Sequence, residues 1–92
     1  MTTCVLIVPA DLRDRANELG AAMGWGSNNY TIPLTSDGTD ITHWATNVAD
    51  PDEWFLELAN DMQGDLPSLQ LVLADTFEEA IASVGLSRVP DE

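Results

Sequence analysis

Hydrophobic positions along the chain change period several times, and each change predicts a new element. Residues 3–8 (TCVLIV) are a continuous apolar run, which is typical of a strand buried on both faces. After Pro9, apolar side chains recur from Leu12 to Met23 at spacings of four, three and four, which predicts a helix. Gly24 is expected to end that helix, because glycine readily adopts the left-handed conformation of a helix C-terminus.

Two alternating segments predict a hairpin. Residues 30–35 (YTIPLT) and 41–48 (ITHWATNV) alternate apolar and polar side chains, and residues 36–39 (SDGT) have the composition of a turn. Proline donates no hydrogen bond to a neighbouring strand, so Pro33 predicts that the first of these strands lies at a sheet edge.

A second helix is expected after residues 50–53 (DPDE). Asp50 is the expected N-cap, with Glu53 three residues later as in a capping box. Gly64 is expected to end this helix. Its predicted apolar face comprises Trp54, Phe55, Leu58, Ala59 and Met62.

Residues 69–74 (LQLVLA) predict a fourth strand, and a last short helix follows. Thr76 and Glu79 repeat the capping-box spacing, and Gly85 is expected to close the helix. Residues 88–92 are expected to form a frayed tail.

The predicted order is β-α-β-β-α-β with an additional C-terminal helix. This order predicts an α+β protein with the ferredoxin-like split β-α-β fold (βαββαβ), in one domain over residues 1–92. Right-handed crossovers would place the first two helices on one face of the sheet. The other face would be covered by the third helix, by a partner or by solvent.

The net charge of the chain limits the kinds of molecule that it can bind. The chain has 16 acidic and 3 basic residues and a net charge of −13, with no lysine and no arginine between Arg15 and Arg88. Such a field repels phosphate backbones and anionic lipid, so nucleic-acid and membrane partners are not expected. Three interpretations stay open: a solvated acidic surface, a docking surface for a basic protein, and a mimic of nucleic-acid charge.

Candidate chemistry is sparse. Cys4 is the only cysteine, which excludes an internal disulfide and a thiolate metal cluster. His43 is the only histidine; Asp37 and Asp40 are near it in sequence, but no second ligand follows at metal-ligand spacing. We therefore expect no metal, cofactor or catalytic residue. The alternative is a small enzyme with a shallow site near His43 and Cys4. These two residues would lie on neighbouring strands if the first and third strands pair.

The candidate interaction residues are Trp25, Trp44, His43 and one acidic stripe. Trp25 lies in a glycine-flanked loop, and Trp44 lies on a central strand with His43 on the opposite face. Trp44 would serve a partner if its face were open, and would be core if the third helix covered it. The stripe consists of Glu53, Glu57 and Asp61, spaced four apart on one helix face, which suits either solvent or a basic partner.

Short motifs resemble those of a group of small uncharacterised phage and prophage proteins. They are residues 8–12 (VPADL), 30–35 (YTIPLT), 42–44 (THW) and 86–89 (LSRV). The resemblance implies no known activity; it favours a phage-encoded accessory or structural protein in the host cytoplasm or the phage particle. The absence of a membrane-length apolar run agrees with the cytoplasm.

Together these features predict a non-enzymatic protein-interaction or assembly module. It would bind a protein partner or form a homo-oligomer through the sheet. The alternatives are the small enzyme and the acidic nucleic-acid mimic.

Overall fold

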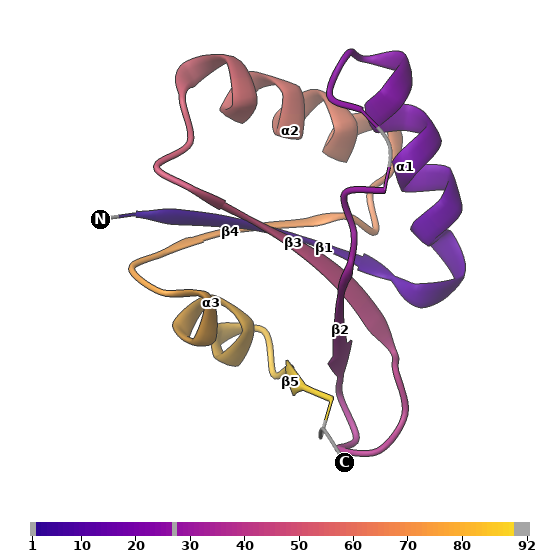
Figure 1. Ribbon diagram of the computed structural model, residues 1–92, viewed down its shortest axis with the longest axis vertical. Helices are drawn as coiled ribbons and strands as arrows, with labels where there is room; N and C mark the ends of the chain where they lie inside the picture. Colours follow the sequence, from indigo (N-terminus) through magenta and orange to yellow (C-terminus); the bar gives the residue numbers. More distant parts are fainter. Residues whose placement is uncertain (1, 27, 90–92) are drawn as a thin grey trace.

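A computed structural model describes residues 2–26 and 28–89, and within them three α-helices flank a five-stranded antiparallel sheet (Figure 1). The predicted α+β class is confirmed. The strands are β1 (Thr3–Pro9), β2 (Ile32–Thr35), β3 (His43–Ala49), β4 (Gln70–Ala74) and β5 (Ser87–Arg88). The helices are α1 (Arg13–Ala22), α2 (Glu53–Asp65) and α3 (Phe77–Ser83), and a 3₁₀ turn (Ala10–Leu12) joins β1 to α1. The strand order across the sheet is β4-β1-β3-β2-β5.

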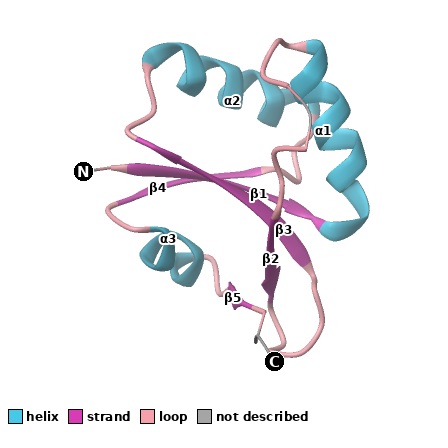
Figure 2. Ribbon diagram, viewed as in Figure 1, coloured by secondary structure: helices cyan, strands magenta, loops and turns pink. Residues whose placement is uncertain are grey.

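Helices cover both faces of the sheet, which explains the continuous apolar run of β1. α1 and α2 lie on one face and α3 lies on the other (Figure 2). Cys4, Leu6 and Val8 pack toward α1 and α2, whereas Val5 and Ile7 pack toward α3. All five side chains are fully buried. Positions 4–8 of β1 therefore all carry apolar side chains. Of the three possible covers for the second face of the sheet, α3 is the one observed.

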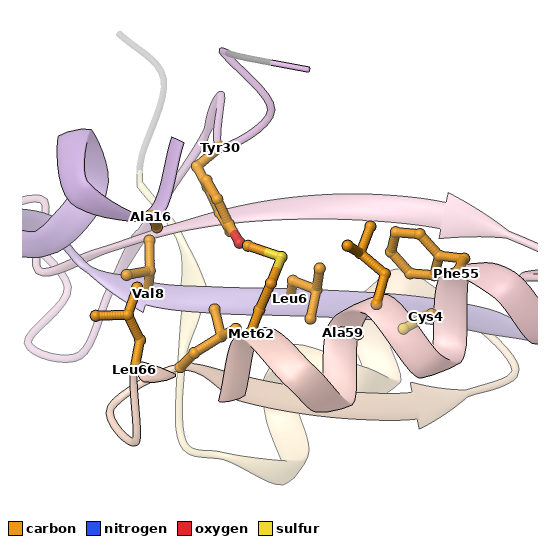
Figure 3. Packing of buried hydrophobic residues seen from close by; sticks show 11 residues of the cluster. Cys4, Leu6, Val8, Ala16, Tyr30, Phe55, Ala59, Met62 and Leu66 are labelled. Carbon is orange, nitrogen blue, oxygen red and sulfur yellow. The ribbon is translucent and has the colours of Figure 1, made fainter. Parts of the chain in front are cut away.

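The larger core lies between the sheet and the two long helices. Tyr30 reaches from the segment before β2 toward Met62 of α2, and its hydroxyl oxygen points at the Met62 side chain (Figure 3). The Trp25 ring packs edge-on against Phe55, with 5.2 Å between ring centroids. It also covers Gly20 of α1, where an added Cβ would lie 3.2 Å from the Trp25 ring. A side chain at position 20 would therefore require the Trp25 ring to shift by a few tenths of an ångström.

The N-terminus of α2 differs from the prediction. Asp52, and not Asp50, caps the helix: its side chain accepts a hydrogen bond of 2.8 Å from the Phe55 N–H. Asp50 has a φ of 48° and its N–H donates to the Thr2 carbonyl oxygen. Both aspartates have the right chemistry for a cap, and the backbone tie to Thr2 holds Asp50 outside the helix.

The C-terminal segment also differs. Arg88 was expected in a frayed tail, but it pairs with Leu34 of β2, and its Nε donates to Glu78 at 2.9 Å. Residues 90–92 of the predicted tail lie outside the described residues. β5 flanks β2, so the prediction that β2 lies at a sheet edge is wrong for Leu34 and Thr35. Pro33 lies beyond that short pairing, as its missing N–H requires.

Candidate functional site

Trp54 is the largest apolar side chain on the described surface. It was predicted in the buried stripe of α2, and this is wrong, because 53% of its surface is exposed. The buried stripe consists of Phe55, Leu58, Ala59 and Met62. At about 100° per residue, Trp54 lies at the margin of this stripe, where sequence periodicity does not separate core from surface.

A hollow of about 240 Å³ lies beside Trp54, between α2 and the end of α1. It is lined by Met23, Trp54, Glu57, Leu58 and Asp61. Met23 is the C-cap of α1, where the left-handed Gly24 follows, so the end of α1 forms one wall. The other wall is the flank of α2 on which positions 54, 57, 58 and 61 succeed one another at helical spacing.

Two of the three predicted acidic residues therefore meet an exposed indole. Glu57 and Asp61 line the hollow, and the third member of the stripe, Glu53, is exposed one turn before Glu57. Among the described residues the one salt bridge joins Arg88 to Glu78, so no described cation pairs with these carboxylates. The hollow thus combines an aromatic face with two carboxylates that no described cation neutralises.

The other two tryptophans have internal partners. Trp25 is half-buried against Phe55 and Tyr30 and closes one end of the larger core. Of the two alternatives left open for Trp44, an open face or a cover by the third helix, neither applies. Trp44 lies on the face that α1 and α2 cover, and the Arg13 guanidinium lies over its ring. Both rings contribute to packing, which leaves Trp54 as the tryptophan that faces solvent most.

His43 and Cys4 do not meet. Cys4 pairs with Val48 near one end of β3, while His43 pairs with Pro9 at the other end. Their side chains also lie on opposite faces, because Cys4 packs under α2 and His43 shares its face with the buried Ala45. Burial raises the pKa of the Cys4 thiol to about 11, which keeps it protonated. The geometry supplies no dyad of these two residues.

Asp37 organises the turn before β3. Its Oδ1 accepts hydrogen bonds from the N–H groups of Thr39 and Asp40 and from the hydroxyls of Thr35 and Thr39, at 2.8–3.0 Å. The two backbone N–H groups, Thr39 first, hold the pKa of Asp37 well below its usual range. His43 faces the hydroxyl of Thr42, with Nδ1 2.9 Å from Oγ1. Within residues 2–26 and 28–89 no three His, Cys, Asp or Glu side chains are grouped to hold a metal ion.

No family model, curated protein or solved structure matches the chain. Among the described helices, none has the length and apolar character needed to cross a membrane. The exposed Trp54 was the residue that sequence reasoning missed. Its exposure could have been inferred from its position at the start of the acidic stripe, three residues before Glu57.

Proposed function

We propose that this protein is a non-enzymatic interaction module that binds a basic segment of a partner protein in the hollow beside α2. The observation that carries the proposal is the half-exposed Trp54 in one hollow with Glu57 and Asp61. An arginine or lysine of the partner would place its cation over the indole face and its N–H groups against the carboxylates.

The size of the hollow supports a side chain as the occupant. Pockets that enclose small-molecule ligands have volumes of about 300–1,000 Å³, whereas this hollow measures about 240 Å³. Tryptophan is also enriched among the residues that dominate protein–protein binding energy. A single long side chain of a partner, held at its tip, fits these dimensions and this chemistry.

The net charge of −13 favours the same class of partner. It accelerates the encounter with a basic protein at low salt and repels acidic ones. The hypothesis of a nucleic-acid mimic is a special case, because the target of a mimic is also basic. Duplex DNA that competes for a basic target would identify that case.

A hexa-arginine peptide provides the first probe, with binding measured by fluorescence anisotropy of a label on the peptide. Trp54→Ala is expected to weaken binding about two- to fivefold, the range of a cation–π contact at an exposed site. The double variant Glu57→Gln/Asp61→Asn should weaken it further than Trp54→Ala, since it removes two charges from the hollow.

The chain offers a matched control on α1. Asp14 and Glu18 are exposed and four residues apart, like Glu57 and Asp61. Asp14→Asn/Glu18→Gln changes the net charge equally, so it reports the loss of general attraction alone. Equal weakening by the two double variants, with no effect of Trp54→Ala, would mean that the hollow is not the binding site.

We also propose the ferredoxin-like fold for this chain. It is supported by the order of the first four strands, β4-β1-β3-β2, and by the position of α1 and α2 on one face. A phage or prophage origin, with action in the host cytoplasm or the phage particle, is supported by the sequence resemblance alone.

A further inference from the structure

The outer edge of β4 is an uncharged strand with no neighbour. β4 lies at one end of the strand order, so its outer backbone N–H and C=O groups have no partner strand among the described residues. Residues 66–74 (LPSLQLVLA) contain no charge, although the chain has a net charge of −13. Natural sheet edges are commonly protected by lysine, by inward charges or by proline within the strand, and β4 has none of these.

Leu73 adds an apolar side chain to this edge. It shares a sheet face with its neighbour Cys4, yet 53% of its surface is exposed, because nothing described covers it on the outer side. Val72 and Leu71 beside it are partly buried. An exposed leucine on an unpaired edge is a template for another strand.

The flank of α2 that adjoins β4 is uncharged as well. Leu56 and Gln63 lie about 160° and about 180° around the helix from Trp54, away from the acidic hollow. Both are partly buried, and Leu56, like Leu71 of β4, packs against the larger core. Glu57 and Asp61 thus lie on the side of α2 toward α1, while the neutral side of the helix lies toward β4.

From this arrangement we infer that a second copy of the chain pairs with β4, strand β4 against strand β4, in antiparallel register about Val72. In this register each Leu71 lies opposite Leu73 of the partner, which covers the exposed leucine on both copies. The pairing joins two five-stranded sheets into one continuous sheet, with the two neutral flanks of α2 toward each other.

Charge selects the antiparallel register. A parallel pair in register would place Asp75 beside its own copy at the end of β4. In the antiparallel pair the two Asp75 residues are six positions apart along the strand, or about 20 Å at 3.4 Å per residue. That separation exceeds the screening length of about 8 Å at physiological ionic strength. A copy of this acidic chain can therefore approach here, whereas the hollow beside Trp54 would repel it.

Light scattering after size exclusion tests the pairing. Because two chains of charge −13 repel each other, the dimer should strengthen from about 50 mM to about 1 M NaCl, as screening increases. Binding of a basic peptide in the hollow should weaken over the same range. The opposite salt dependence separates a failure of this inference from a failure of the proposed function.

Leu73→Lys is the variant that should break the dimer. It is expected to weaken dimerisation at least about tenfold, as loss of a central interface contact does. This effect is expected although the added lysine makes the net charge less negative and so reduces the repulsion between the two copies. Ile41→Lys makes the same change at another exposed aliphatic residue, in the loop before β3, and should dimerise like the wild type.

Cross-linking locates the register independently of size. Val72→Cys would face its own copy across the two-fold axis, at a distance that a disulfide spans. Exposed Ser68→Cys is the control, since two copies of position 68 lie about 27 Å apart in this register. The inference predicts rapid oxidation of the Val72→Cys dimer only. A monomer at both salts, or equal cross-linking at the two positions, would overturn it.

Discussion

The guanidinium of Arg13 lies over the Trp44 ring, with its central carbon 4.1 Å from the ring centroid. Its Nε also donates a hydrogen bond of 2.8 Å to the Tyr30 carbonyl oxygen. One side chain thus joins the start of α1 to β3 and to the segment that leads into β2. The chain has only three basic side chains, and one of them is therefore used to hold the fold together.

We expect Arg13→Ala to lower the free energy of unfolding by about 1–3 kcal/mol, through loss of the cation–π contact and the charged hydrogen bond. Arg13→Lys should recover part of this, because lysine keeps the charge but lacks the planar group that stacks and donates together. Urea denaturation measures both. Arg15→Ala, an exposed arginine on the same helix, should change stability by less than about 0.5 kcal/mol. Equal losses at positions 13 and 15 would contradict the role of the Trp44 contact.

Tyr30 is fully buried, and its hydroxyl has no hydrogen-bond partner among the described residues. Burial also raises its pKa well above the usual range. A buried hydroxyl without a partner costs about 1–3 kcal/mol, so Tyr30→Phe should stabilise the protein by about 1 kcal/mol. Tyr30→Leu, which leaves a void beside Met62, should instead destabilise it. Thermal denaturation measures the stability of both variants. A loss of stability in Tyr30→Phe would show that the hydroxyl is hydrogen-bonded.

The sequence predicted the elements well because their signals are local. The apolar run of β1 lies where expected. So does the cap of α3, where Thr76 Oγ1 accepts a hydrogen bond of 3.1 Å from the Glu79 N–H, and so does Gly85, which follows the end of that helix. The failures concern relations that periodicity does not encode. Trp54 lies at the margin of a helical stripe, and Arg88 pairs with a strand more than fifty positions earlier. The candidate hollow was therefore half predicted: its carboxylates by spacing, its tryptophan only by the fold.

Cys4 provides a probe of opening under alkaline conditions. Its side chain is fully buried, and burial raises its pKa to about 11, above the ordinary value of about 8.5 for an accessible thiol. A raised pKa means that the neutral thiol contributes stability at neutral pH, which is lost as pH rises from about 9 to about 11. The wild type should therefore lose more stability over this window than Cys4→Ala. Ellman's reagent at pH 8 should react only after denaturant is added; fast labelling of the native protein would contradict the burial.

Asp37 makes an opposite prediction for acid. Its pKa is held below the usual range, chiefly by the Thr39 and Asp40 N–H groups, so its contribution is complete at neutral pH. It is lost as the pH falls below about 4 toward the lowered pKa. Asp37→Asn should be less sensitive to acid in this window than the wild type. The amide signals of Thr39 and Asp40, followed by NMR between about pH 2 and pH 6, report the turn directly. Titration of these signals with an ordinary aspartate midpoint would be evidence against the hydrogen-bonded carboxylate.

The two carboxylates of the hollow beside Trp54 should lower the stability of the protein. Glu57 and Asp61 are like charges four residues apart on α2, a spacing that costs a helix about 0.2–0.5 kcal/mol. Glu57→Gln/Asp61→Asn should therefore raise the free energy of unfolding while it weakens binding of the hexa-arginine peptide. Added salt should reduce this gain, because it screens the same repulsion in the wild type. Urea denaturation at about 50 mM and about 1 M NaCl measures the difference. If the double variant gained stability and bound the peptide as tightly as the wild type, the two carboxylates would be an acidic surface with no part in recognition.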